Sequence, residues 1–352
     1  MSWVKRAIYQ IEADFRRSSD THLIRVNLPV LKHVTLYLKD ESTHPSGSLK
    51  HRLARSLFLY GLCNGQIEEG TTIVEASSGN TAVSEAYFAR LLGLPFVAVV
   101  PEGTSHEKIE AIRFYGGDCQ IVAANEIYSE AERLAVESGG YFMDQFANAE
   151  RVTDWRGNNN IANSIFEQMG AEPSPQPDWI VVSAGTGGTS ASIGRFIRYQ
   201  GLATRLCVAD PTFSVFYDFF QSGEAGMTID RSSRIEGIGR PRVEPSFIST
   251  VIDRMIKVPD EASLATLGFL EMVLNRKCGG STGTNVFAAL QLASELEVLG
   301  ETASVVTLIC DGGERYLDTY YSESWIKEQN LDLSGVREQL AEFSETGRLS
   351  PG

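Results

Sequence analysis

The chain of 352 residues is long enough for about two domains, and its 43% of apolar residues can fill a large core. It carries 31 basic and 45 acidic side chains, which give a net charge of −14. Such an acidic chain repels nucleic acid and anionic membrane surfaces, so we expect neither as a partner. The charge excludes no class of small-molecule enzyme.

The N-terminal residues predict an amphipathic helix, because apolar side chains recur at helical spacing from Trp3 to Phe15. They lack the apolar core and cleavage site of a secretory leader. The longest apolar run, LLGLPFVAVV, is short and contains Pro95, so we expect no membrane-spanning helix. Five scattered cysteines without a CxxC pair indicate buried, reduced thiols in a cytoplasmic protein.

Along the rest of the chain, short apolar runs alternate with longer helical patterns. The predicted strands cover 34–41, 71–80 with its terminal loop, 95–103, 119–125, 141–146, 179–185, 205–211, 254–263 and 304–313. The predicted helices cover 81–93, 105–117, 127–140, 186–199 and 286–296. This alternation indicates an α/β fold in which twisted, mostly parallel sheets are flanked by helices.

A lysine stands at the junction of a turn and a helix in HPSGSLKHRLARSLFLYG, residues 44–61. Lys50 could be a solvated charge in the first turn of a surface helix. It could instead be an amine placed in a pocket for chemistry. The loops at the carboxyl ends of the strands distinguish these two interpretations, because ligands of α/β proteins bind there.

The first such loop, SAGTGGTSASIG, has the composition of a phosphate cradle. Its glycines let backbone N–H groups converge before a helix, and its threonines add hydroxyl donors: Gly185, Thr186, Gly187, Gly188 and Thr189. The plainer alternative is a glycine turn without a ligand. A dinucleotide fingerprint would need glycine where Ser190 stands, which favours a monophosphate and argues against a nicotinamide dehydrogenase.

The second loop, EASSGNTAVS, crowds polar donors around Gly79 just before a helix. Its donors are Ser77, Ser78, Asn80 and Thr81. An ordinary N-cap would explain one of these residues but not four. The loop therefore suits a carboxylate or another anion.

Together, a lysine at a helix start, a phosphate cradle and an anion loop match the needs of pyridoxal phosphate (PLP). The PLP aldehyde takes a lysine amine as a Schiff base, and its phosphate takes a glycine loop. The anion loop then holds the carboxylate of an amino-acid substrate. The histidines that flank the lysine, His44 and His51, lack metal-ligand spacing, so we expect packing or phosphate-side roles for them and no metal.

These motifs, together with EGIG, GGSTGT and DGGERYL, occur in the order seen in the cysteine synthase/cystathionine β-synthase family. The chain resembles this family of fold-type II PLP enzymes from about Asp20 to Tyr320. Its variants of the lysine and GGSTGT motifs look closest to the L-cysteine desulfhydrase branch. It departs from the family at Arg156–Asn160, which replace a TGPEI run.

The resemblance implies a role for each matching residue. The cofactor would be bound by Lys50, Asn80, Gly185, Thr186, Gly187, Gly188, Thr189 and Ser281. The substrate would be bound by Ser77, Ser78, Gly79, Thr81, Gln145, Gly237 and Ile238. Among these, Lys50 would be the catalytic residue, and Ser281 would face the pyridine nitrogen.

The implied reaction is β-elimination of L-cysteine to sulfide, pyruvate and ammonia through an aminoacrylate. The alternative is a cysteine synthase that carries out β-replacement on O-acetylserine or a related activated serine. A non-catalytic protein that binds PLP or an amino acid is a third reading, which the intact set of motifs disfavours. The resemblance also implies a homodimer.

For the domains, we expect a smaller N-terminal α/β domain over 42–156. A larger α/β domain would comprise 1–41 together with 157–330. The charged segment 331–352 would form a helical tail.

Overall fold

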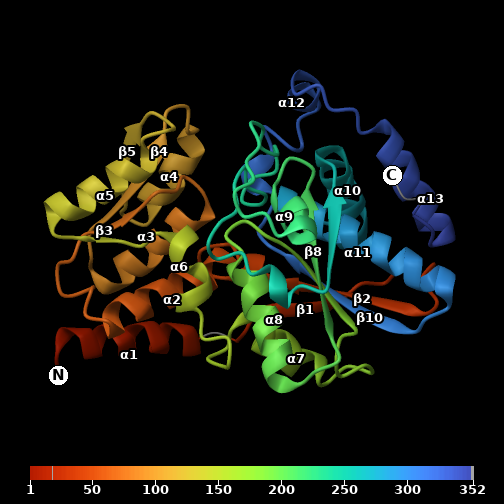
Figure 1. The fold of residues 1–352 in the computed structure, drawn as a ribbon, viewed down its shortest axis with the longest axis horizontal. Helices are drawn as coiled ribbons and strands as arrows, with labels where there is room; N and C mark the ends of the chain where they lie inside the picture. Colours follow the sequence, from red (N-terminus) through yellow and green to blue (C-terminus); the bar gives the residue numbers. More distant parts are fainter. Residues whose placement is uncertain (18, 350–352) are drawn as a thin grey trace. The chain divides into compact units, whose positions relative to one another are not determined.

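The computed structural model describes residues 1–17 and 19–349, which form two compact units (Figure 1). The smaller unit comprises Met1–Asp20 and His44–Asp154. The larger unit comprises Thr21–Thr43 and Trp155–Gly352. Each unit has its own sheet and its own hydrophobic core.

The smaller unit is built on a parallel sheet with the strand order β5-β4-β3-β6. Its strands are β3 (Ile73–Glu75), β4 (Phe96–Pro101), β5 (Asp118–Val122) and β6 (Tyr141–Phe142). Its helices are α1 (Trp3–Arg16), α2 (Lys50–Cys63), α3 (Asn80–Leu92), α4 (His106–Phe114), α5 (Ile127–Ser138) and α6 (Gln145–Val152). Side chains alternate along a strand, so Ile73 packs with α1, α2 and α3 while Val74 packs with α5. Burial on both faces explains the continuous apolar runs.

The larger unit is built on a sheet with the order β1-β2-β10-β7-β8-β9, in which only the β1–β2 pair is antiparallel. Its strands are β1 (His22–Arg25), β2 (Val34–Asp40), β7 (Trp179–Ser183), β8 (Arg205–Pro211), β9 (Arg254–Val258) and β10 (Ala303–Ile309). Its helices are α7 (Ile161–Met169), α8 (Gly188–Gln200), α9 (Phe216–Ser222), α10 (Asp260–Leu274), α11 (Gly280–Leu299), α12 (Glu323–Glu328) and α13 (Ser334–Thr346). Short 3₁₀ turns lie at η1 (Glu41–Thr43), η2 (Ser249–Val251) and η3 (Glu314–Tyr316).

The α/β fold class predicted from the sequence is confirmed, but two boundaries differ from the prediction. Residues 1–20 belong to the smaller unit and not to the larger one, because Ala7 and Ile11 of α1 pack in the core of α2 and α3. The predicted tail is no separate part, since Leu340 and Phe343 of α13 pack in the core of the larger unit. The last three residues of that tail, 350–352, lie outside the described chain.

Two smaller expectations also need correction. The predicted strand 141–146 ends at Phe142, and a helix begins at Gln145. Of the five thiols, only Cys207 and Cys278 are buried, whereas Cys63 is exposed.

Over residues 1–17 and 19–349, no helix has the length and apolar content to cross a membrane.

The parallel strands bring particular loops together within each unit. In the smaller unit β3 pairs directly with β6, so the loop at 76–79 lies beside the start of α6. In the larger unit β7 pairs directly with β10, so the loop at 184–187 lies beside 310–313. Of the predicted site residues, Ser77–Gly79 and Gly185–Gly187 lie in these loops, and Gln145 begins α6.

Candidate active site

Lys50 is the first residue of α2 and is half-buried. The turn before it contains Gly47, whose φ of 78° lies in the left-handed region and whose N–H donates to the His44 carbonyl at 2.7 Å. One face of α2 is buried in the core, where Leu57 is 1% exposed. The backbone of Lys50 is therefore held by a tight turn on one side and a packed helix on the other.

The segment before α2 is anchored on α3 through Ser46. Its Oγ lies 3.0 Å from Nδ1 of His51 and 2.9 Å from Oγ of Ser84. The His51 ring also packs on the rings of His44 and Phe88, each at a centroid distance of 4.8 Å. Both histidines thus pack, which is the first of the two roles expected of them.

The loop after β3 ends at Gly79, the N-cap of α3, and no side chain of the described chain caps this helix. Ser77, Ser78 and Asn80 are half-buried around it, and the Gly79 N–H donates to Ser77 Oγ at 3.3 Å. The first turn of a helix has backbone N–H groups without intrahelical acceptors. An anion such as a substrate carboxylate can satisfy them here.

Thr81 and Gln145 are buried and bound to each other. The hydroxyl of Thr81 donates to Oε1 of Gln145 at 2.7 Å. The Gln145 N–H in turn donates to Oε2 of Glu75 at 3.2 Å, and the Ala76 N–H donates to Oε1 of Glu75 at 2.8 Å. Sequence reasoning found Thr81 and Gln145 but missed Glu75. The available signal was an acidic residue at the last position of a buried strand.

The glycine loop of the larger unit tolerates no side chain at two of its positions. A Cβ on Gly185 would lie 2.0 Å from the Gly237 carbonyl oxygen, and one on Gly187 would lie 2.5 Å from that of Ser246. Gly187 also has a φ of 89° as the N-cap of α8, and a glycine has no side chain of its own with which to cap the helix. A helix N-terminus that begins in such a compact loop is suited to a phosphate.

The threonines of this loop differ in their surroundings. Thr186 is buried, and its Oγ1 accepts from the Gly188 N–H at 3.2 Å. Thr189 is half-buried in the first turn of α8. Ser190 donates its hydroxyl to the Gly187 carbonyl at 3.0 Å, so this hydroxyl serves the helix start.

The segment predicted to line the mouth of the site braces the glycine loop. The Gly239 N–H donates to the Ala184 carbonyl at 2.8 Å, and Ile238 is 9% exposed within the core of the larger unit. Gly237 is exposed and has a φ of 81°. The segment is thus held by its backbone and by one buried side chain.

Ser281 lies in the first turn of α11 and is 8% exposed. Tyrosines from the segment after β10 fix the start of this helix. The Tyr321 hydroxyl donates to the Cys278 carbonyl and accepts from the Cys278 N–H, each at 2.8 Å. Tyr316 donates to Asp311 Oδ2 at 2.7 Å, and burial, followed by the charge of Asp311, raises the pKa of this phenol. Sequence reasoning missed these tyrosines, because their contacts are not local patterns.

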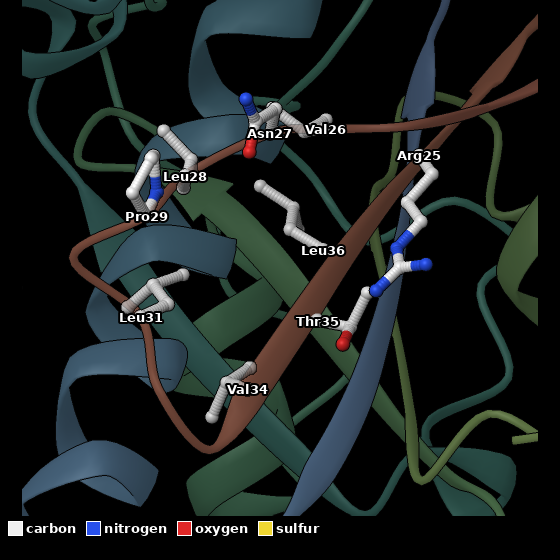
Figure 2. Close-up of a pocket in the computed structure, with 9 residues that line it drawn as sticks. All are labelled: Arg25, Val26, Asn27, Leu28, Pro29, Leu31, Val34, Thr35 and Leu36. Carbon is white, nitrogen blue, oxygen red and sulfur yellow. The ribbon is translucent and has the colours of Figure 1, made fainter. Parts of the chain in front are cut away.

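A separate pocket opens beside the β1–β2 hairpin of the larger unit. Figure 2 shows its lining, which is largely aliphatic and includes Leu28, Pro29 and Leu36 with Arg25 at one side. None of the predicted site residues lines it. We therefore do not assign the predicted chemistry to this pocket.

The structure places the predicted site residues in two groups, one in each unit. The smaller unit holds Lys50, Ser77, Ser78, Gly79, Asn80, Thr81 and Gln145. The larger unit holds Gly185, Thr186, Gly187, Gly188, Thr189, Gly237, Ile238 and Ser281. The first group offers an amine and an anion loop, and the second offers a cradle that a Cβ would fill and a hydroxyl at a helix start. This donor set fits PLP.

Comparisons with known proteins agree with this chemistry. The L-cysteine desulfhydrase Cds1 of Mycobacterium tuberculosis (strain ATCC 25177 / H37Ra) is 58% identical over 352 residues, which cover 99% of this chain and 96% of that protein. A putative cysteine synthase of Sinorhizobium fredii (strain NBRC 101917 / NGR234) is 29% identical, with coverage of 91% and 93%. The crystal structure of O-ureido-L-serine synthase matches with a TM-score of 0.75 and 28% identity, covering 85% of this chain and 91% of that one.

The family described as pyridoxal-phosphate dependent enzyme matches residues 18–311. This range spans the loops of both units described above. The chain therefore belongs to the family of pyridoxal-phosphate dependent enzymes.

Proposed function

We propose that this chain is a PLP-dependent L-cysteine desulfhydrase. L-cysteine and water would give sulfide, pyruvate and ammonia, a reaction in which atoms balance without an oxidant or reductant. The observation that carries the proposal is the 58% identity to a protein named L-cysteine desulfhydrase over nearly the full length of both chains. A relative named as a putative cysteine synthase reaches 29%.

We assign the cofactor contacts as the resemblance implies. Lys50 would hold the aldehyde carbon, and Asn80 would hydrogen-bond the ring hydroxyl. Gly185–Thr189 would bind the phosphate through backbone N–H groups at the start of α8. Ser281 would meet the pyridine nitrogen with a neutral hydroxyl, which does not force that nitrogen to stay protonated. Bound PLP withdraws electrons from the Cα of an amino acid, so that the Cα proton becomes acidic and a group on Cβ can leave.

The chain's own residues would orient the substrate and move its proton. The first turn of α3 and the hydroxyls of Ser77 and Ser78 would hold the substrate carboxylate. With the carboxylate fixed, Nζ of Lys50 would accept the proton from Cα. Thr81 and Gln145 are bound to each other, so they would support this loop from within the smaller unit.

Cysteine synthesis by β-replacement is the second candidate. It is favoured by the named cysteine synthases among the relatives and by the likeness to O-ureido-L-serine synthase. The two reactions share every residue assigned above and differ in whether water or a nucleophile completes the reaction.

Product analysis separates the two candidates. Holoenzyme incubated with L-cysteine alone should release sulfide and pyruvate in equal amounts. Incubation with O-acetylserine and sulfide tests the synthase reaction, and a higher kcat/KM in that assay would overturn the desulfhydrase assignment. Loss of the PLP absorption band in Lys50→Ala tests the cofactor assignment separately.

We further propose that the protein is a cytoplasmic homodimer, as the cysteine pattern and the family resemblance imply. Light scattering after size-exclusion chromatography tests the dimer. A mass corresponding to one chain would contradict it.

A further inference from the structure

Two carboxyl groups lie in the interior of the smaller unit, and the roles assigned above use neither of them. Glu75 ends β3 and Glu85 lies on α3, and both side chains are 0% exposed. Burying an ionised carboxylate is costly unless charge or hydrogen bonds compensate it. Each group must therefore be paired or protonated.

The buried carboxylate of Glu75 is stabilised by hydrogen bonds from backbone N–H groups. Its two oxygens accept from the N–H groups of Ala76, at the start of the substrate loop, and of Gln145, at the start of α6. The side chain of Gln145 then accepts from Thr81 on α3. One carboxylate thus connects the ends of β3 and β6 to the first turn of the helix that would hold the substrate.

Glu85 has no such support. No N–H or O–H donor of the described chain hydrogen-bonds either of its oxygens. The group at hydrogen-bonding range is the Glu75 carboxyl, which already accepts two N–H groups. A carboxyl whose hydrogen-bonding neighbour is itself an acceptor gains a hydrogen bond if it keeps its own proton. The geometry therefore places the proton of this pair on Glu85.

The surrounding charges agree with one retained proton. Burial, followed by the charge of Glu75, raises the pKa of Glu85 well above its usual range, while Lys50 on α2 opposes the shift. Burial, followed by the charge of Asp144 before α6, raises the pKa of Glu75 to about 8. Tyr141 on β6 also senses the charge of Glu85. Such strongly interacting groups titrate as a pair.

We propose that Glu85 is a positioning residue which keeps its proton at neutral pH and donates a hydrogen bond to Glu75. This bond would hold the Glu75–Gln145–Thr81 connection behind the substrate loop. The placement of the proton stands on the structure alone. The effect on catalysis rests on the proposed function, because it requires that the loop at 76–81 binds the substrate.

Two substitutions separate this role from simple core packing. Glu85→Gln keeps a donor for Glu75 and nearly the same volume, so it should leave KM for L-cysteine close to that of the wild type. Glu85→Leu puts an apolar side chain of similar size in the same place and removes the donor, so it should raise KM roughly tenfold and change kcat less. A residue that only packs would tolerate leucine at least as well as glutamine.

Infrared spectroscopy of the holoenzyme without substrate tests the proton directly. A protonated carboxyl absorbs apart from carboxylates, so the wild-type minus Glu85→Gln difference spectrum at pH 7 should contain one such band. The exposed Glu132 on α5 provides the matched control, and Glu132→Gln should give no band. Buried Asp210, whose pKa burial raises to about 7, cancels in these differences.

The outcomes are distinct. The band in the Glu85 difference, with KM raised in the leucine variant and not in the glutamine variant, supports the proposal. No band, or equal KM for the two variants, overturns it. If Glu85→Leu does not fold, the wild-type minus Glu85→Gln difference spectrum still shows whether Glu85 is protonated. If L-cysteine is not turned over by the wild type, the proposed function fails while the spectrum continues to test Glu85.

Discussion

The Thr81 hydroxyl donates a 2.7 Å hydrogen bond to Gln145, although 64 residues separate the two along the chain. They meet because β3 and β6 pair in parallel, with Ile73 opposite Tyr141, and a helix follows each strand. Both side chains are at most 4% exposed. The loop proposed to bind the substrate is therefore supported by a buried polar contact between two helix starts.

Removal of this contact should weaken substrate binding. Gln145→Ala leaves the buried Thr81 hydroxyl without its acceptor, which should cost about 1–2 kcal/mol of stability and raise KM for L-cysteine about tenfold. Urea unfolding and steady-state kinetics measure the two effects. Gln66→Ala changes an exposed glutamine of the same unit and should alter neither. An unchanged KM in the Gln145 variant would contradict the support role.

Two glycines with left-handed backbone conformations can be compared, Gly187 in the glycine loop and Gly201 at the C-cap of α8. A Cβ on Gly201, whose φ is 63°, would meet no atom within 4 Å, whereas a Cβ on Gly187 would clash with backbone. Gly201→Ala should cost only the backbone strain, about 1–2 kcal/mol, and retain PLP affinity. Gly187→Ala should destabilise the chain further and lower PLP affinity. Equal PLP affinity for both variants, measured by absorbance titration, would argue against a phosphate at this loop.

The tyrosine that fixes α11 should matter for the cofactor. Tyr321→Phe leaves the Cys278 N–H and carbonyl without their shared partner, at a cost of about 1–2 kcal/mol, and should loosen the helix start that carries Ser281. We expect weaker PLP binding in a titration of the apoprotein. Tyr9→Phe is the control, because Tyr9 is 53% exposed. Equally weakened PLP binding in both variants would contradict a specific role of Tyr321 in holding the start of α11.

The buried carboxyl pair should make stability depend on pH. Burial raises the pKa of Glu85 well above its usual range and that of Glu75 from 4.5 to about 8, so the folded pair holds a proton on Glu85 that the unfolded chain loses. This contribution is fully present below pH 4.5 and is lost as pH rises through about 8. One such proton changes the free energy of unfolding by at most about 1.4 kcal/mol per pH unit.

Chemical denaturation of the wild type and of Glu85→Gln across this pH range measures the effect. The wild type should lose stability relative to the variant as pH rises from 4.5 to about 8. Parallel stability curves for the two proteins would show that the pair retains no proton.

Most of the fold could be predicted because its signals are local. The predicted strand at 205–211 matches β8 in both bounds, since a buried apolar run ends at Asp210 and Pro211. The glycine loop could likewise be predicted, because its glycines are required by local sterics: only glycine fits at Gly185 and Gly187. Such features depend on residues that are neighbours in the chain.

Other features could not be predicted, because they depend on distant partners. Gln145 was placed in a strand, yet Asp144 caps a helix there by accepting from the Ala147 N–H. The packing of the N-terminal helix against α2 and α3 is not visible in its own amphipathic pattern. Glu85 looks like an ordinary helix residue until the structure places it beside Glu75.

The most direct test of the central claim is a product assay with L-cysteine as the sole substrate, run on the wild-type holoenzyme and on Lys50→Ala. Sulfide and pyruvate should form in a one-to-one ratio with the wild type, and neither should form with the variant. Sulfide without matching pyruvate, or unchanged turnover by the Lys50 variant, would contradict the account.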